Sequence, residues 1–380
     1  MAISPDKSSL RHIDLSVPVA LSSDNYTSIE RTPWAGSALA SGIKRDQSKS
    51  ASQKIGESWE ISCDPEMPSK LKVAPDHSLT ELINMRPSEC LSADLIRGGR
   101  AACDILVKLL NASSPLSLQL HPTDDNKSLK PNECGKPESW LVLSAEAGAG
   151  LYLGFSKPLS VQNIGELLTA GTFTKELLQF VPVRAGDYFE IEPHVPHAIG
   201  PGIVLLEPQR LLPGKSGKTW RLWDWNRKYN ASGALDPQNG NPRELHIQEA
   251  LRILDPPRQY GSGYVDSLRR EPRRETIAAG ATADIFPANP WYQTISIQMR
   301  AGSRIKLLPI AGYACATVIS GGLTARGKKG VSQMMNQGES FFIAAAGLPN
   351  DLATPNKDSL FTLVIPAGQG VQTHGGHIFG

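Results

Sequence analysis

The sequence predicts a mainly β fold, because strand-like runs and turn residues recur along the chain while helical segments are few. Short apolar or alternating runs bounded by turn residues predict strands. They lie at residues 188–193 (YFEIEP), 202–208 (GIVLLEP), 292–299 (YQTISIQM), 316–322 (ATVISGG) and 360–366 (LFTLVIP). With 34 glycines and 29 prolines among 380 residues, the chain has turn residues to connect many strands.

Helical periodicity appears in three regions, which we interpret as helical insertions at about 77–112, 160–181 and 242–255. The first region contains HSLTELINM and ADLIRGGRAACDILVKLL, the second VQNIGELLTAGTFTKELLQFV and the third PRELHIQEALRIL. Because these segments do not alternate with strands, we expect helices that pack outside the sheets and not a parallel βαβ fold.

A domain boundary is predicted at residues 260–276 (YGSGYVDSLRREPRRET), a charged run with few large apolar residues. Such a composition is typical of a solvated connector. We therefore expect a first domain at residues 1–259 and a second β domain at 277–380. The arginines of the connector have no interleaved aromatic pattern, which argues against a nucleic-acid patch.

Charge and hydropathy exclude several classes of partner. The 39 basic and 37 acidic residues give a net charge of +2, which provides no general attraction to nucleic acid or to a membrane surface. No stretch approaches the length of a membrane span, and the N-terminal run has no apolar core of signal-peptide length. A small-molecule partner is therefore expected.

The cysteines indicate a reducing compartment. They are odd in number, scattered and without a CxxC spacing, so they predict neither a disulfide framework nor a thiolate zinc site. The five are Cys63, Cys90, Cys103, Cys134 and Cys315. We expect reduced, packed thiols and a cytoplasmic location.

The run SLQLHP at residues 117–122 alternates polar and apolar side chains. Successive strand residues point to opposite faces, so Ser117, Gln119 and His121 share one face. Leu118 and Leu120 occupy the other face and are expected to pack in the core. The polar face lines either solvent, at an edge strand, or a site.

Side chains able to bind a metal occur in this run and in two other segments. They are Gln119 and His121, then Glu138 in GKPESW (135–140), then His194 and His197 in RAGDYFEIEPHVPHAIGPG (184–202). Imidazole, carboxylate and amide-oxygen ligands together suit zinc, iron(II), manganese or nickel. The residues alone do not choose among these metals.

The segment at 184–202 resembles the way β-barrel cupins present a metal-binding histidine, with a Gly-Asp turn, an alternating strand, a Pro-containing turn and then His-Ala. His197 stands at the ligand position. His194 stands where cupins usually have glycine, because the turn there can require a positive φ. We therefore expect His194 to be a turn residue facing solvent and not a ligand.

Six motifs in order resemble type I mannose-6-phosphate isomerase, also called phosphomannose isomerase, of the cupin superfamily. They are IGESWEIS (55–62), VKLLNASSPLSLQLHPTDD (107–125), GKPESW (135–140), PHAIGPGIVLLEPQ (196–209), TWRLWDWNR (219–227) and RELHIQEAL (243–251). The likeness covers roughly residues 30–255 and is weaker beyond. It implies a mainly β, double-cupin fold of jelly-roll barrels with helical insertions, in which residues 1–259 form the catalytic, metal-binding domain.

The resemblance also implies a site and a reaction. One zinc per chain is expected to be held by Gln119, His121, Glu138 and His197. The family interconverts mannose 6-phosphate and fructose 6-phosphate, moving a proton between C1 and C2 through an enediol. The expected partner is thus a small sugar phosphate, and the chain is expected to be a monomer or homodimer.

Four further residues receive roles from the family pattern. Glu207 is the expected base, and Arg221 and Lys136 are expected to meet the phosphate or the developing enediolate. Ser117 is expected either to hydrogen-bond the substrate or to be an ordinary interior hydroxyl. The stretch from Glu207 to Arg221 is longer than the family pattern, and its lysines, Lys215 and Lys218, are interpreted as solvated loop residues.

The C-terminal half, at residues 277–368, resembles a second cupin. Its strand GESFFIAAAG is not followed by a histidine before LPND, so this half is expected to be metal-free. His374 and His377 are interpreted as a pair in the terminal tail.

Two other functions remain open from the sequence. One is a cupin iron(II) oxygenase with His121, Glu138 and His197 as a facial triad. The other is a non-catalytic cupin that binds a sugar phosphate. The presence of Gln119, Lys136 and Arg221 favours the isomerase, because an oxygenase has no evident need for phosphate-directed cations. The expected base, Glu207, argues against a protein without turnover.

Overall fold

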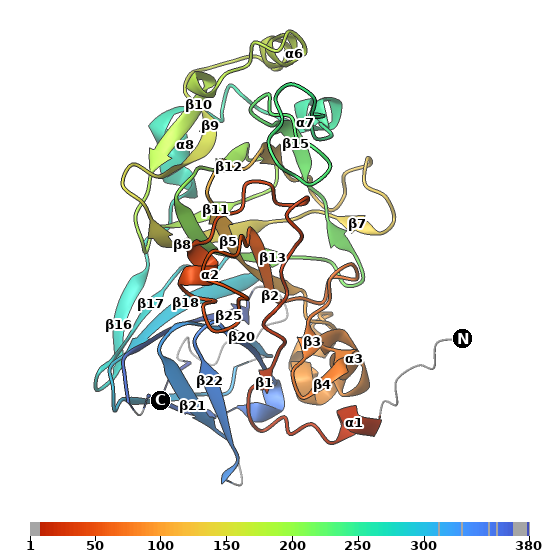
Figure 1. The fold of residues 1–380 in the computed structure, drawn as a ribbon. Helices are drawn as coiled ribbons and strands as arrows, with labels where there is room; N and C mark the ends of the chain where they lie inside the picture. Colours follow the sequence, from red (N-terminus) through yellow and green to blue (C-terminus); the bar gives the residue numbers. More distant parts are fainter. Residues whose placement is uncertain are drawn as a thin grey trace.

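The structure, a computed structural model, describes residues 8–310, 312–327, 330–348, 350–354, 356–367 and 378–379. Strands dominate it, in two barrel-like halves that lie one above the other in Figure 1. The predicted double cupin with few helices is confirmed. His374 and His377 lie outside the described residues.

The first half contains two five-stranded sheets, which hold the candidate site between them. One has the order β11 (Tyr188–Ile191), β8 (Glu138–Ala145), β13 (Ile203–Arg210), β5 (Ile105–Ala112), β2 (Glu57–Ile61). The other has the order β10 (Leu178–Pro182), β9 (Gly150–Phe155), β12 (His197–Ile199), β6 (Leu118–Leu120), β15 (Trp220–Trp223). Two short ribbons accompany them, β3 (Lys70–Leu71) with β4 (Ala74–Ser78) and β7 (Glu133–Cys134) with β14 (Ser216–Gly217).

The second half contains a seven-stranded and a four-stranded sheet. The larger has the order β1 (Val19–Ala20), β23 (Ser340–Ile343), β20 (Ala314–Ser320), β25 (Ser359–Pro366), β18 (Tyr292–Met299), β17 (Ala281–Ile285), β16 (Arg273–Ala278). The smaller has the order β19 (Arg304–Leu307), β24 (Asn350–Ala353), β21 (Gly322–Arg326), β22 (Ser332–Asn336). The five strand-like runs of the sequence all lie in strands of these sheets or of the first half.

The helices are short and lie outside the sheets (Figure 1). They are α1 (Ser8–Arg11), α2 (Ala38–Ser41), α3 (Leu79–Met85), α4 (Pro87–Leu91), α5 (Ala93–Arg97), α6 (Val161–Thr169), α7 (Ile247–Ile253) and α8 (Gly261–Leu268), with 3₁₀ turns at Lys175–Leu177 and Ala345–Gly347. In the described part of the chain, none is long and apolar enough to cross a membrane.

The helical prediction for residues 77–112 is wrong at its C-terminal end, where residues 105–112 form strand β5. All eight residues of β5 are buried, since this strand lies between β13 and β2 in the middle of its sheet. A short, continuously apolar run does not distinguish a buried strand from a buried helix. The second predicted helical region likewise ends in strand β10.

The prediction of a solvated connector at 260–276 is also wrong in part. Residues 261–268 form α8, which buries Val265 and Leu268 against the first half, and β16 begins at Arg273. Two arginines of the segment form ion pairs with the first half, Arg269 with Asp187 at 3.0 Å and Arg270 with Glu190 at 2.8 Å. Charged residues there thus attach the segment to the first half.

The N-terminal segment joins the two halves. Strand β1 pairs with β23 of the second half, although it belongs to the predicted first domain. Nearby, the fully buried Lys44 ammonium lies 2.7 Å from the Glu60 carboxylate and donates to the Gly338 carbonyl, also at 2.7 Å. The division at 1–259 and 277–380 therefore remains our proposal for the two barrels. Residues 19–20 are an exception, because they form a strand of the seven-stranded sheet of the second half.

Replacing Lys44 by Ala should strongly destabilise the protein, because it leaves the Glu60 charge buried without its partner. Removing one member of a buried pair costs about 3–5 kcal/mol in the free energy of unfolding. Urea denaturation measures this cost. The neighbouring Arg45 side chain is 57% exposed, so Arg45→Ala serves as the control and should change stability by less than about 0.5 kcal/mol. Equal stability of the two variants would contradict the importance of the pair.

Candidate active site

The predicted two-faced strand is confirmed. Leu118 and Leu120 are fully buried in an apolar cluster beneath β6. On the opposite face, Ser117 and Gln119 line a cavity of about 340 Å³, and His121 follows at the end of the strand. The polar residues of SLQLHP therefore belong to a site and not to a solvent-exposed edge.

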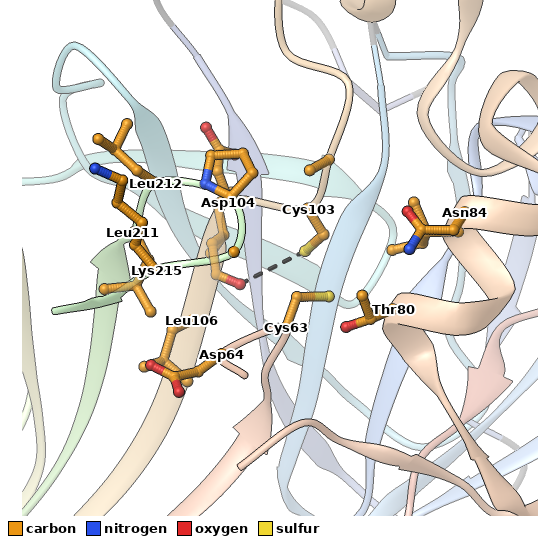
Figure 2. A pocket seen from close by; sticks show the side chains of 15 residues that line it. Cys63, Asp64, Thr80, Asn84, Cys103, Asp104, Leu106, Leu211, Leu212 and Lys215 are labelled. Carbon is orange, nitrogen blue, oxygen red and sulfur yellow. Dashed lines mark hydrogen bonds between the residues drawn. The ribbon is translucent and has the colours of Figure 1, made fainter. Parts of the chain in front are cut away.

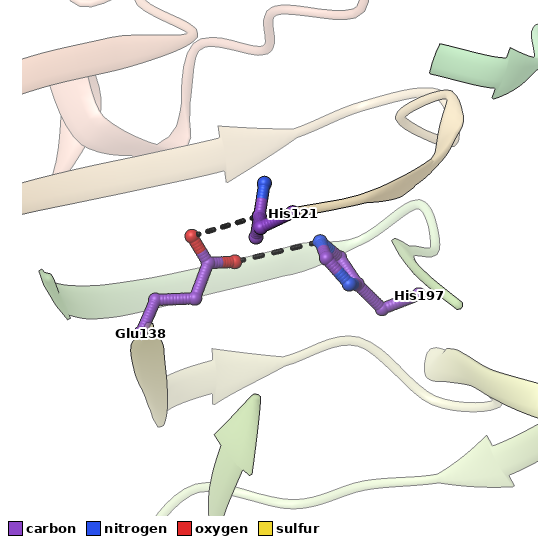
Figure 3. Close-up of side chains that lie close together, drawn as sticks. All are labelled: His121, Glu138 and His197. Carbon is purple, nitrogen blue, oxygen red and sulfur yellow. Dashed lines mark ion pairs between the residues drawn. The ribbon is translucent and has the colours of Figure 1, made fainter. Parts of the chain in front are cut away.

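Three of the predicted ligands meet at one end of the barrel (Figure 3). Glu138 begins β8, His197 begins β12, and His121 follows β6, so the group joins both sheets. The Nε2 atoms of His121 and His197 lie 3.2 and 3.5 Å from the two carboxylate oxygens of Glu138. All three candidate ligand atoms lie within 4.8 Å of one another.

Backbone contacts orient both imidazoles for metal binding. Nδ1 of His121 donates to the Lys218 carbonyl at 3.1 Å, and Nδ1 of His197 donates to the Val195 carbonyl at 2.8 Å. These donations place the proton on Nδ1 and leave each Nε2 with a free lone pair. Both Nε2 atoms, and Oε1 of Glu138, are buried without a hydrogen-bond partner in the described part of the chain.

Burial and neighbouring charges together keep these ligands in the protonation states that a metal requires. Burial lowers the pKa of His197 to about 3, with further repulsion from His121, and also lowers the pKa of His121. Burial alone would raise the pKa of Glu138, but Lys136 and His121 hold it well below its usual range. Two neutral imidazoles and one carboxylate therefore converge, as in many divalent-metal sites.

Gln209 is a residue of this site that the sequence analysis missed. Its Nε2 donates to Oε2 of Glu138 at 3.0 Å, and its side chain is fully buried. Gln209 lies two residues after Glu207 on β13, so both point to the same face. The alternation of side chains along VLLEPQ could have revealed it, because Glu207 and Gln209 are two residues apart.

The fourth predicted ligand, Gln119, lies directly opposite His197 across the β6–β12 pair.

His194 is a turn residue, as predicted, with a φ of +73°. It is not part of the three-residue metal group. Two hydrogen bonds of its backbone fix the turn. The N–H donates to the His121 carbonyl, and the carbonyl accepts from Nε2 of Gln259, both at 2.8 Å. The expected exposure is only partial, since Nε2 of His194 is buried.

Glu207 lies in the cavity wall, where the barrel interior makes its carboxyl hard to ionise. The side chain is buried, Oε1 accepts from the Trp140 indole at 3.3 Å, and Lys108 lies 3.9 Å from Oε2. Burial, followed by repulsion from Glu138, raises the pKa of Glu207 to about 8. Lys108 was not identified from the sequence, because a single lysine in ILVKLLNA gives no functional signal.

The predicted cations also line this cavity. Lys136 Nζ lies 3.0 Å from Glu138. Burial opposes its charge, but Glu138 and Glu207 raise its pKa above the usual value. Arg221, on β15, donates from Nε to the Ser117 hydroxyl at 3.2 Å and from Nη1 to the Glu244 carbonyl at 2.8 Å.

The two loop lysines have different positions. Lys218 lines the large cavity and pairs with Glu133 at 2.8 Å. Lys215 instead lines a second, smaller cavity of about 190 Å³ (Figure 2). Cys63 and Cys103 lie in the wall of that cavity, and all five cysteines of the chain are free.

Several known proteins are similar to this chain in sequence. The phosphomannose isomerase type I catalytic domain matches residues 26–138. A mannose-6-phosphate isomerase of Streptococcus mutans is 30% identical over 293 residues, which cover 76% of this chain and 81% of that protein. The chain belongs to the type I phosphomannose isomerase family. A second relative, mannose-6-phosphate isomerase ManA of Bacillus subtilis, is 33% identical over 154 residues, or 40% of this chain and 44% of that protein.

Solved structures of phosphomannose isomerases share the fold. The crystal structure of the mannose 6-phosphate isomerase from Bacillus subtilis has a TM-score of 0.71 at 21% identity, covering 91% of this chain and 99% of that one. A mannose 6-phosphate isomerase bound with zinc and yttrium has a TM-score of 0.64 at 16% identity, covering 92% and 99%. These structures confirm the fold, and the family model with the Streptococcus mutans relative confirms the family resemblance seen in the sequence motifs.

Replacing His121 or His197 by Ala should lower the content of bound divalent metal by at least about tenfold, because each removes an oriented imidazole ligand. Elemental analysis of the purified variants measures this content, with circular dichroism as a check on folding. His194→Ala is the matched control, since His194 is a nearby histidine outside the metal group, and it should keep its metal. Full metal in both test variants would contradict the assignment.

Proposed function

We propose that the protein is a zinc-dependent aldose-ketose isomerase that interconverts mannose 6-phosphate and fructose 6-phosphate. The observation that carries this proposal is the juxtaposition of a buried His-Glu-His group with a cavity containing a buried carboxylate and several cations. The family membership and the names of the relatives support the substrate. No redox cofactor is needed for a proton shift between neighbouring carbons.

The proposed metal is zinc, one ion per chain, held by His121, Glu138 and His197 with Gln119 as fourth ligand. Nitrogen and carboxylate ligands with no thiolate suit a catalytic zinc. A bound zinc acts as a Lewis acid on substrate oxygens. Gln209 and the two backbone carbonyls that accept from the imidazoles hold the ligands in place. A relative of similar fold has been crystallised with zinc.

Glu207 is the proposed base. As a carboxylate it takes the proton from C2 of mannose 6-phosphate, which leaves an enediolate with its negative charge on O1. The proton of the C2 hydroxyl passes to O1, and Glu207 returns the carbon-bound proton to C1, giving fructose 6-phosphate. The reverse reaction starts at C1 of the ketose. A base whose pKa lies near neutrality is well matched to both removing and returning a proton, and the pKa of Glu207 is raised towards that range.

Lys136 is proposed to stabilise negative charge on the substrate oxygens as the enediolate develops. Its ammonium lies 3.0 Å from Glu138 and has favourable charge interactions with both Glu138 and Glu207. In a buried cavity such a charge is worth more than in water. Arg221 and Ser117, which contact each other, are proposed to bind the phosphate of the substrate.

Two alternatives can be separated from this proposal. An iron(II) oxygenase with the same three ligands has no need for the buried base and the phosphate-directed cations in the cavity. A binding protein without turnover would not need a base beside the metal group. For the compartment and assembly, we propose a cytoplasmic monomer or homodimer, and the five free thiols support the compartment.

The purified protein should convert mannose 6-phosphate to fructose 6-phosphate in a coupled assay. Removing the metal with a chelator should abolish turnover, and adding about one equivalent of zinc per chain should restore it. Unphosphorylated mannose should be a poor substrate. Oxygen consumption that depends on iron(II) would favour the oxygenase, whereas tight substrate binding without turnover would favour the binding protein.

Glu207→Gln should lower turnover by about a hundredfold or more, because the amide keeps the size of the side chain but cannot accept the carbon-bound proton. Metal content should not change. Exchange of the C2 hydrogen of mannose 6-phosphate with deuterated water, followed by NMR, measures the proton transfer directly. Glu190→Gln is the control, since Glu190 is a buried strand carboxylate of the same sheet that pairs with Arg270 outside the cavity. Exchange at the parent rate in the Glu207 variant would assign the base elsewhere.

A further inference from the structure

A second guanidinium group, from Arg243, lines the same cavity as Arg221. Its Nε and Nη2 both donate to the Asp224 carboxylate at 2.8 Å. Its Nη1 has no hydrogen-bond acceptor in the described part of the chain. Arg243 thus combines a fixed position, set by a two-point contact, with a donor that is free to bind a ligand.

Hydrogen bonds hold the segment that carries Arg243 against Arg221. The N–H of His246 donates to the Arg221 carbonyl at 2.7 Å, and the Arg221 N–H donates back to Nδ1 of His246 at 3.2 Å. Nη1 of Arg221 donates to the Glu244 carbonyl at 2.8 Å. Nη2 of Arg221 has no acceptor among the described residues, so each arginine keeps one free donor.

This end of the cavity carries more positive than negative charge. Asp224 pairs with two arginines, Arg227 at 2.6 Å and Arg243 at 2.8 Å. Arg221 has no carboxylate within ion-pair distance in the part of the chain that the structure describes. Burial, and then repulsion from Arg243, lowers the pKa of Arg221 to about 10. A group with about two negative charges, such as a phosphate monoester, would relieve this repulsion.

The surplus positive charge lies towards the Ser117 end of β6. Arg221 is opposite Gln119 across the β6–β15 pair, and its Nε donates to Ser117, which is four residues before His121 in the chain. A sugar phosphate bound with its C1–C2 end at the metal and Glu207 therefore directs its phosphate towards the Ser117 end of β6.

We propose that Arg243 is a second phosphate-binding residue, whose free Nη1 binds the phosphate of the sugar together with the free Nη2 of Arg221. The inference rests on the proposed function for the identity of the substrate. It makes Arg243 a determinant of specificity for phosphorylated over neutral sugars, with Asp224 holding its guanidinium in place.

Arg227 provides a matched control within the same cluster. Like Arg243 it binds Asp224, and both guanidinium groups lie 5.6 Å from the centre of the Tyr229 ring. Unlike Arg243, it does not line the cavity. Its other two nitrogens are already engaged, by the Asp224 carbonyl and by the Ser114 hydroxyl. Structural disturbance around Asp224 should therefore affect both variants, whereas loss of a phosphate contact should affect only one.

Isothermal titration calorimetry of the metal-loaded full-length protein tests the proposal, with mannose 6-phosphate, mannose and inorganic phosphate as probes. Arg243→Gln should weaken binding of mannose 6-phosphate by on the order of tenfold or more, the usual effect of losing a charged hydrogen bond. Binding of mannose should not change. Arg227→Gln should stay within about twofold of the parent for every probe.

Several outcomes would overturn the proposal: parent-like affinity in Arg243→Gln, an equal loss in Arg227→Gln, an equal loss for mannose, or a parent protein that binds mannose 6-phosphate no better than mannose. If Arg243→Gln loses metal or fold, Arg243→Lys replaces it. Lysine can still pair with Asp224 but lacks the forked second donor, so a parent-like affinity in that variant would also count against the proposal.

The measurement distinguishes this proposal from the proposed function, because it does not depend on turnover. A protein that binds mannose 6-phosphate through Arg243 without isomerising it would refute the isomerase and keep the phosphate site. An active isomerase whose Arg243→Gln variant keeps the parent affinity and kcat/KM would keep the proposed function and refute the phosphate-binding role of Arg243.

Discussion

Burial of the Glu138 carboxylate is the constraint on which the site depends. A carboxylate without access to water is unstable unless neighbouring groups compensate its charge. Here Lys136, two histidines and Gln209 surround it within 3.5 Å. Gln209 lies on β13 of the same sheet, the two histidines lie on β12 and just after β6 of the other sheet, and Lys136 lies in the loop before β8, so a shift of one sheet against the other would leave a buried charge unmatched. The same interactions therefore orient the candidate ligands and fix the register of the barrel.

The barrel interior is divided between packing and chemistry. β13 shows this division within one strand: all eight of its residues are buried, yet Glu207 and Gln209 face the cavity while the alternate residues Val204 and Leu206 pack in an apolar cluster. Such a strand tolerates few substitutions, because a polar residue on the packed face or an apolar one on the other face would disturb either stability or the site.

Much of the site was predictable because its chemistry is concentrated in short motifs. His121, Glu138 and His197 could be found from residue type and from the resemblance to the phosphomannose isomerase motifs. Gln209 and Arg243 escaped notice because a lone amide in a strand and an arginine before a helix are common in any protein. Strand β5 was mistaken for helix, since a central strand buried on both faces shows no alternation. The positions of Gln209, Arg243 and β5 depend on which distant segments lie side by side, and no local sequence pattern encodes this.

The position of β1 sets an order of events for a chain leaving the ribosome. Val19 pairs with Phe342, and Lys44 bonds to Gly338, so these two positions wait for partners about 300 residues further along the chain. At about 5–20 residues per second, translation alone imposes a delay of roughly 15–60 s. During this interval the edge of β1 and the Lys44 ammonium lack their final contacts with the second half. The strands of the first barrel, at residues 57–223, can pair before then, whereas the segment that carries β1 and Lys44 must tolerate an unfinished state until the strands of the second half arrive.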